Sequence, residues 1–177
     1  MNSALSRLRQ RWYIIAASAP QPQTPTPAPE PGPSTPAPSS AARLRFDRNQ
    51  VSATPGARIT LHVLADNVTD LFAAPLKINF DPKALHLIDL RRGALLANDG
   101  QDVIFSKNVL NDTGEASINL SRFPGSGGVS GSGVLLTLEF EAASAATTSV
   151  SISNIAARNP NNDPIRLDNT QAEVTVK

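Results

Sequence analysis

The stretch NVTDLFAAPLKINFDPKALHLIDL, residues 67–90, contains the pattern that decides the fold. Apolar and polar residues alternate from Leu76 to Phe80, and this period of two is typical of a β-strand with one buried face. The strand is expected to end at Asp81-Pro82, because proline lacks the N–H that a sheet ladder needs and restricts the residue before it. Asp81 is expected to cap the following turn with its carboxylate.

Similar segments recur along the rest of the chain, separated by turn signals such as Pro55-Gly56. The segments are residues 44–46, 51–54, 59–65, 76–80, 85–90, 103–106, 116–120, 134–140, 149–155 and 172–176. A single helical turn fits residues 82–85 or 92–97, and no longer helical period occurs. The pattern predicts an all-β sandwich of two packed sheets with about eight or nine strands.

Composition divides the chain into three parts. Between Pro20 and Pro38 every second or third residue is proline, which favours an extended and disordered chain because too little apolar surface is present to offset the entropy of ordering. Residues 20–42 are therefore predicted to be a disordered Pro-rich linker. Residues 43–177 are long enough to bury the core of a single domain.

Residues 1–19 have the order of a secretory signal. Arg7, Arg9 and Arg11 precede a short apolar run, and Ala17-Ser18-Ala19 resembles a cleavage site. The alternatives are a short amphipathic or disordered leader, or the tail end of a longer natural protein whose start lies elsewhere. The segment is too short for a spanning helix.

Charge and composition exclude several functional classes. The net charge is +1 and residues 43–177 hold no basic cluster with interleaved aromatic residues, so nucleic acid is not an expected partner. The chain has no cysteine, and His62 and His86 are its only imidazoles. No G-x-S-x-G motif is present, and residues 125–133 lack the ending of a phosphate-binding loop. We expect a protein that is not an enzyme, with residues 125–133 as a flexible connection.

One segment has the spacing of a weak metal site. Residues 159–164, NPNNDP, place oxygen ligands at alternate positions, as the start of a calcium loop does. The sixth position is Pro164 rather than glycine and the twelfth is Thr170 rather than glutamate, so this is not an EF-hand. An Asx-rich turn is the favoured interpretation, and no cofactor is expected. The alternative is a looser calcium site that uses Asn161, Asp163 and Asp168.

Several ordered landmarks resemble the cohesin domain. They are VSATPGARITLHV at residues 51–63, the F-D-P-x-x-L ending at residues 80–85, and GVLLTLEF at residues 133–140. The resemblance covers residues 44–176 and implies a jelly-roll sandwich. The NDTG and GVSGSG motifs, residues 111–114 and 128–133, also resemble cohesin-type domains at the C-terminus of bacterial type II secretion and pilus secretins, which follow a similar Pro-rich linker.

The resemblance implies a partner surface and one departure from the family. Cohesins bind dockerins through a flat sheet face, and dockerin-binding members carry an Asn and an Asp on the strand before the D-P break. The matching positions here are Ala73 and Pro75, which lack polar side chains and suit apolar contact better. The expected contact residues are Asp70, Leu71, Phe72, Ala73, Pro75, Lys77 and Asn79, acting through a sheet face or edge.

These observations predict a non-catalytic, extracytoplasmic protein-interaction module in a secretion or cell-surface assembly. The expected partner is a dockerin-like protein or a secretion-system component, and the location is secreted, periplasmic or outer-membrane-associated. The alternative is a carbohydrate-binding module linked to polysaccharide breakdown. That alternative rests on fold kinship, because Trp12 and Tyr13 lie in the leader and only phenylalanines, among them Phe72 and Phe123 near loops, remain to stack on sugars.

Overall fold

Alternating sequence segments form strands throughout the computed structural model, which describes residues 41–177. The leader at residues 1–19 and all but the last two residues of the linker lie outside the described residues. The described part contains these elements: β1 (Arg43–Phe46), β2 (Gln50–Ala53), β3 (Arg58–Leu71), β4 (Leu76–Asn79), β5 (Leu85–Arg92), the 3₁₀ turn η1 (Leu95–Ala97), β6 (Val103–Leu110), β7 (Glu115–Arg122), β8 (Val129–Ala142), β9 (Ala146–Ser153) and β10 (Gln171–Val176).

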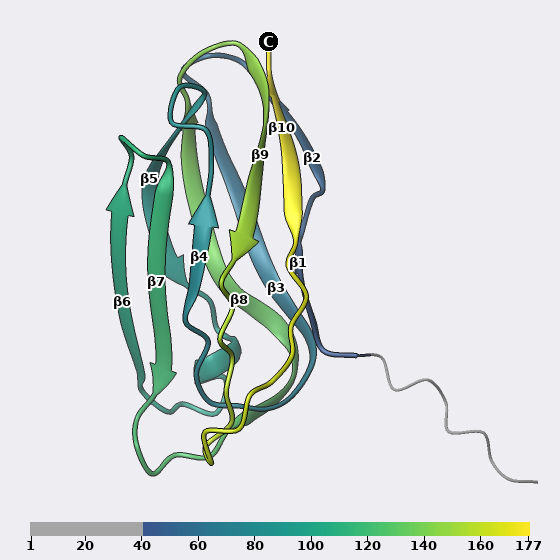
Figure 1. The fold of residues 1–177 in the computed structure, drawn as a ribbon, viewed down its shortest axis with the longest axis vertical. Coiled ribbons are helices and arrows are strands. Elements are labelled where there is room, and N and C mark those ends of the chain that lie inside the picture. Colours follow the sequence, from purple (N-terminus) through teal and green to yellow (C-terminus); the bar gives the residue numbers. More distant parts are fainter. Residues whose placement is uncertain (1–40) are drawn as a thin grey trace, which may run out of the picture. The chain divides into compact units, whose positions relative to one another are not determined.

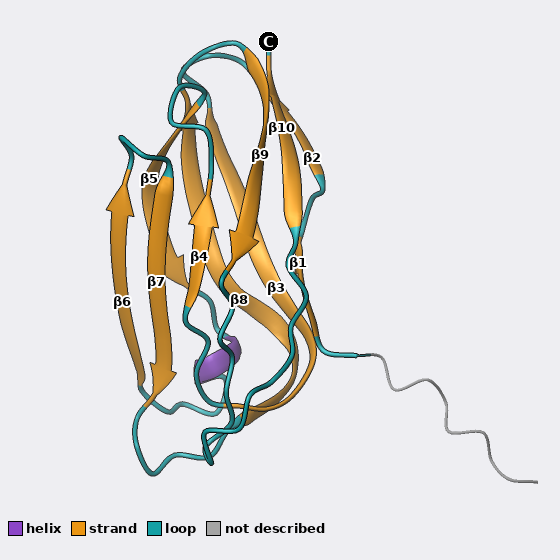
Figure 2. Cartoon of the chain, in the orientation of Figure 1, coloured by secondary structure: helices purple, strands orange, loops and turns teal. Residues whose placement is uncertain are grey.

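The strands form two sheets that face each other (Figures 1 and 2). The four-stranded sheet has the order β1-β3-β8-β5, and the six-stranded sheet has the order β2-β10-β9-β4-β7-β6. Strand β2 pairs with β10 in parallel, and the other pairs are antiparallel. The predicted all-β, two-sheet sandwich is confirmed, and η1 falls within one of the two predicted helical turns.

The stretch that decides the fold behaves as its sequence predicts. On β4, Leu76 and Ile78 are buried whereas Lys77 and Asn79 are half-buried on the opposite face. The strand ends before Asp81, whose Oδ1 accepts a hydrogen bond from the backbone N–H of Lys83 at 2.9 Å. This short contact starts the turn that leads into β5.

The core lies between the two sheets and consists of the inward residues of the alternating strands. Leu61 and Val63 of β3 and Leu138 and Phe140 of β8 are fully buried. The Phe140 ring packs edge-on against Phe80, with centroids 5.3 Å apart and planes at 69°. Each such side chain contributes about 1.5–3 kcal/mol through removal of apolar surface from water.

The pairing of β3 with β8 contains irregularities that the alternation does not predict. Asn67 and Asp70 have φ of 52° and 56°, and the register shifts on both sides of Val68. Bulges of this kind reverse which residues of a strand face the core. The second half of the segment predicted as a flexible connection, residues 129–133, belongs to β8 because it pairs with this bulged part of β3.

A buried arginine ties η1 to the six-stranded sheet. Arg122, at the end of β7, is 1% exposed and donates from Nη1 to the carbonyl of Leu96 at 2.6 Å. Its guanidinium also contacts both carboxylate oxygens of Asp99, at 3.0 and 2.6 Å. These hydrogen bonds from Arg122 hold the pKa of Asp99 below its usual value.

Candidate protein-interaction face

The outer face of the six-stranded sheet is composed mainly of small polar side chains. Because alternate residues of a strand point to opposite sides, the residues between the buried positions of four neighbouring strands lie on this face. We name it the serine-rich face, and its residues are Ser151 and Ser153 of β9, Lys77 and Asn79 of β4, Glu115, Ser117, Asn119 and Ser121 of β7, and Ile104, Ser106, Asn108 and Leu110 of β6.

Side-chain hydrogen bonds hold the centre of the serine-rich face in place. Lys77 Nζ donates to Glu115 Oε1 at 2.7 Å across β4 and β7. Asn79 Nδ2 donates to Ser153 Oγ at 2.7 Å across β4 and β9. A partner therefore meets polar groups that are already oriented before it arrives, so less side-chain entropy is lost on contact.

Four of the seven predicted contact residues share this side of the sheet. Ala73 and Pro75 precede β4, and like Lys77 and Asn79 they are half-buried and alternate with buried positions. The Ala73 carbonyl accepts a hydrogen bond from the N–H of Arg158 at 2.8 Å, so the segment before β4 continues the sheet. Strand β4 has neighbours on both sides, so partner contact there uses the face and not main-chain pairing at an edge.

The other three predicted residues lie at the end of β3 or just after it. Phe72 is half-buried, and its N–H donates to the carbonyl of Arg158 at 2.8 Å. Asp70 Oδ1 accepts from the N–H of Gly128 at 3.2 Å, and the Asp70 N–H donates to Ser130 Oγ at 2.9 Å. Leu71 is 0% exposed, so it was wrong as a contact residue. Its side chain faces the core like those of Leu61 and Val63, because the register shifts on the two sides of Val68 cancel.

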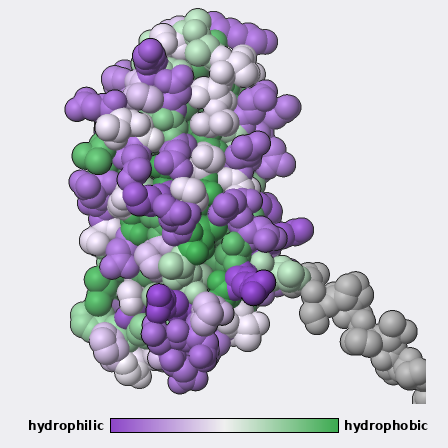
Figure 3. Space-filling view, viewed as in Figure 1, coloured by the Kyte–Doolittle hydropathy of each residue, from purple (hydrophilic) through white to green (hydrophobic). Residues whose placement is uncertain are grey.

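Sequence reasoning missed the contribution of β6. Ile104 is 43% exposed and Leu110 is 46% exposed, and both lie on the serine-rich face. Figure 3 shows hydrophilic residues over most of this face and hydrophobic residues along the margin where Figure 1 places β6. The apolar run at residues 103–105 was visible in the sequence, but which of its side chains face outward could not be known without the pairing to β7.

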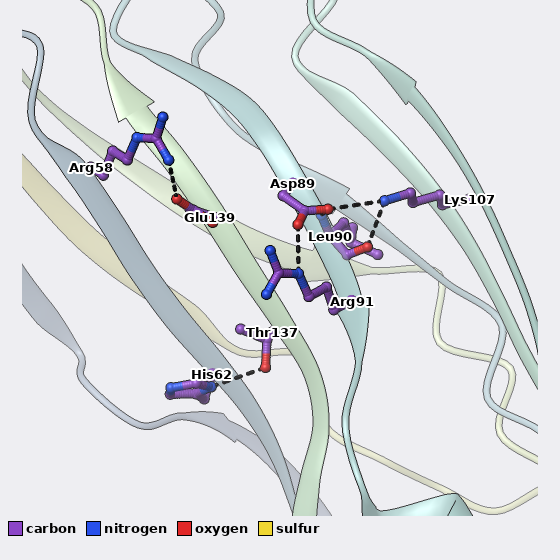
Figure 4. Close-up of polar contacts among 8 residues, drawn as sticks. All are labelled: Arg58, His62, Asp89, Leu90, Arg91, Lys107, Thr137 and Glu139. Atoms are coloured by element: carbon purple, nitrogen blue, oxygen red, sulfur yellow. Dashed lines mark hydrogen bonds and ion pairs between the residues drawn. The ribbon is translucent and has the colours of Figure 1, made fainter.

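The opposite side of the molecule, the outer face of the four-stranded sheet, is charged. Arg58 donates to Glu139 at 3.1 Å, and Asp89 accepts from Arg91 at 2.6 Å and from Lys107 at 3.2 Å (Figure 4). The hydrogen bonds from Arg91 and Lys107 lower the pKa of Asp89.

The two histidines also lie on strands of the four-stranded sheet. His62 Nδ1 is 3.1 Å from Thr137 Oγ1, and His86 is exposed on β5 (Figure 4 shows the first). Within residues 41–177, neither imidazole forms an ion pair or hydrogen bond with a carboxylate. A shallow hollow of about 120 Å³ lies beside Thr60 and Thr137.

Hydrogen bonds explain the conformation of the predicted metal segment. Asn159 and Asp163 are joined twice, by Asn159 Nδ2 to Asp163 Oδ2 at 3.0 Å and by the Asp163 N–H to Asn159 Oδ1 at 2.8 Å. The Asn162 N–H also donates to the Asn159 carbonyl at 3.0 Å, so the segment is a hydrogen-bonded turn that the Asn159 and Asp163 side chains close. No hydrogen bond among the described residues links Asp168 to Asn161 or Asp163, and a calcium site there stays a prediction.

Comparison with known proteins identifies the family. The sequence model described as "Cohesin domain" matches residues 46–176, which include all of the strands from β2 to β10. The chain belongs to the cohesin family. Cohesin domains are non-catalytic protein-interaction modules. A search of curated proteins found no match. Residues 41–177 contain no helix that is long and apolar enough to cross a membrane.

Solved cohesin structures share the fold at low sequence identity. The second type II cohesin of the ScaA scaffoldin of Acetivibrio cellulolyticus has a TM-score of 0.65 and 16% identity, covering 78% of this chain and 98% of its own. The sixth cohesin of scaffoldin B from the same organism was solved with a mutant Cel5 dockerin. It has a TM-score of 0.63 and 19% identity, covering 78% of this chain and 100% of its own. A non-cellulosomal cohesin of Archaeoglobus fulgidus has a TM-score of 0.62 and 15% identity, covering 77% of this chain and 92% of its own.

Proposed function

We propose that this cohesin domain binds a protein partner on its serine-rich face, with β4 at the centre of the contact. The observation that carries the proposal is the arrangement of Ala73, Pro75, Lys77 and Asn79. They lie in one row on a mostly polar surface, and the ion pair between Lys77 and Glu115 holds the charges at its centre.

The chemistry of this row favours a partner that differs from an ordinary dockerin. Ala73 and Pro75 stand where the resemblance places a polar pair, so this row offers apolar contact at those two positions and hydrogen bonding at Lys77 and Asn79. A partner with a complementary apolar strip, either dockerin-like or a component of a secretion system, fits this surface.

We further propose that the domain works outside the cytoplasm, in a secretion or cell-surface assembly. Support comes from the signal-like order of residues 1–19 and the Pro-rich spacer at residues 20–42, which would display the domain away from its attachment. Carbohydrate binding finds less support: Phe123 is the one aromatic residue among the large exposed hydrophobics of residues 41–177, whereas flat sugar platforms use several rings.

The proposal is tested by measuring binding of the full chain to a panel of dockerins, secretion-system proteins and insoluble polysaccharides. Two matched charge-reversal variants then show which face of the domain the partner contacts. Lys77→Glu breaks the ion pair to Glu115 on the serine-rich face, and Arg58→Glu breaks the pair to Glu139 on the charged face. We expect Lys77→Glu to weaken capture of a protein partner at least about tenfold, or about 1.4 kcal/mol, and Arg58→Glu to leave it unchanged. Equal binding by both variants, or binding to polysaccharide alone, would reject the proposed face.

A further inference from the structure

Strand β6 is the edge of the six-stranded sheet, and its backbone has one side without a strand partner. On β7, the Leu120 carbonyl accepts from the Ala74 N–H at 2.9 Å, and the Arg122 N–H donates to the Phe72 carbonyl at 3.0 Å. Even-numbered residues of β7 therefore direct their backbone groups toward β4. In a regular strand the odd-numbered residues direct theirs to the other side, toward β6.

The register then identifies the free backbone groups of β6. Ser121 pairs with Ile104 and Glu115 pairs with Leu110, so the even-numbered residues of β6 are those that exchange hydrogen bonds with β7. The odd-numbered residues direct their N–H and C=O groups outward from the sheet. These residues are Val103, Phe105, Lys107 and Val109.

The other three edges of the described sheets are protected. Strands β1 and β2 have four residues each, and β1 carries Arg43 and Arg45. Strand β5 is capped by the amide of Asn111, which donates to the Leu87 carbonyl at 3.2 Å and accepts from the Leu87 N–H at 3.0 Å. Strand β6 has eight residues and no proline, so it is the edge best suited to accept another strand.

We propose that β6 pairs with β6 of a second copy of this chain, antiparallel and about a two-fold axis at Lys107. This register places Ile104 opposite Leu110, and Phe105 opposite Val109. The half-exposed Ile104 and Leu110 then cover each other on the serine-rich face. Outward-facing free backbone groups of both copies meet in three residue pairs, which exchange about six hydrogen bonds.

Alternative registers lose this match. If the second β6 strand is shifted by one residue, outward-facing side chains of one copy lie opposite inward-facing side chains of the other. If it is shifted by two residues, the apolar Ile104 lies opposite the polar Asn108. The register also places the two Lys107 residues opposite each other. Their charges are already compensated, because each Nζ contacts the Asp89 carboxylate of its own chain at 3.2 Å and the Leu90 carbonyl at 2.7 Å. The chain's own linker is a poor substitute, since its prolines lack N–H donors.

Disulfide trapping tests the register directly, because the chain contains no cysteine. Ser106 and Asn108 form a pair of close, non-hydrogen-bonded neighbours across the proposed axis. A mixture of full-length Ser106→Cys and Asn108→Cys chains should give a cross-linked dimer under mild oxidation, and neither variant alone should. Cross-linking of one variant with itself, or none in the mixture, would overturn the pairing.

Sedimentation of the full chain without any partner provides the second test. We expect Ile104→Lys and Leu110→Glu each to raise the dimer dissociation constant at least tenfold. An equimolar mixture of the two variants should restore the dissociation constant of the parent chain, because the new Lys and Glu side chains then lie opposite each other. Ile88→Lys is the matched control, since Ile88 is 42% exposed on the other sheet and should have no effect. A chain that is monomeric up to its solubility limit, or a dimer unaffected by Ile104→Lys, refutes the proposal. Lys77→Glu should leave the dimer intact, which separates this result from partner binding.

Discussion

Replacement of Gly128 by alanine should destabilise the domain strongly, whereas the same change at its neighbour Gly127 should not. A Cβ at Gly128 would lie 2.3 Å from the backbone carbonyl oxygen of Asp70, and a Cβ at Gly127 would meet no atom within 4 Å. A carbon and an oxygen normally approach to about 3.3 Å, so the start of β8 or the bulged end of β3 must move by about 1 Å.

The cost has two parts. Overpacking of this size is worth about 1–3 kcal/mol. The movement also strains two hydrogen bonds, from the Gly128 N–H to Asp70 Oδ1 and from the Asp70 N–H to Ser130 Oγ, each worth about 0.5–1.5 kcal/mol. We expect a loss of about 2–4 kcal/mol in the free energy of unfolding for Gly128→Ala.

Thermal denaturation followed by circular dichroism at 218 nm measures the difference. A loss of 2–4 kcal/mol corresponds to a decrease of roughly 6–15 °C in Tm for a domain of this size. Gly127→Ala should stay within about 2 °C of the parent chain, in line with ordinary surface changes. If the two variants melt together, the contact between β3 and β8 is not as close as the structure describes.

Four further outcomes are expected. Arg122→Met should lower the free energy of unfolding by about 2–4 kcal/mol in urea titrations, because it removes three hydrogen bonds from a buried side chain. Asp99 has a lowered pKa in the folded state, so its contribution is complete above the unfolded value of about 4 and is lost as pH falls through the folded pKa; Asp99→Asn should flatten this acid limb of stability against pH. Asn111→Ala should cost about 1–2 kcal/mol by uncapping β5, whereas exposed Asn108→Ala should cost less than about 0.5 kcal/mol. Saturating calcium should not change Tm, because the Asp163 carboxylate already accepts a hydrogen bond from the Asn159 amide. A rise in Tm with calcium that Asp163→Ala abolishes would show a calcium site.

Most of the strands could be predicted because one face of each is buried. The period of two in residues 59–65 and 76–80 follows from that burial, and Asp81-Pro82 ends β4 through a property of proline that acts locally. The order of strands in the sheets could not be predicted in this way. The parallel pair of β2 and β10 depends on which distant segments meet, and no local pattern encodes it.

The candidate site was predicted in part for the same reason. Lys77 and Asn79 were placed outward correctly because they lie within a regular strand. Leu71 faces the core because the two reversals of the alternation, beside Asn67 and Asp70, cancel and return it to the inward side that Leu61 and Val63 share. The exposure of Ile104 depends on pairing of β6 with β7 alone, so its role was visible only once the edge of the sheet was known.

The pairing of β2 with β10 also has a consequence for the nascent chain. Val51 pairs with Val174, which lies near the other end of the domain in the sequence. A ribosome must therefore translate nearly the whole domain before β2 and β10 can pair. Contacts so distant in sequence form slowly, and until then β2 has no strand beside it. During synthesis β2 therefore stays unpaired and accessible to chaperones until the C-terminal strand has been made.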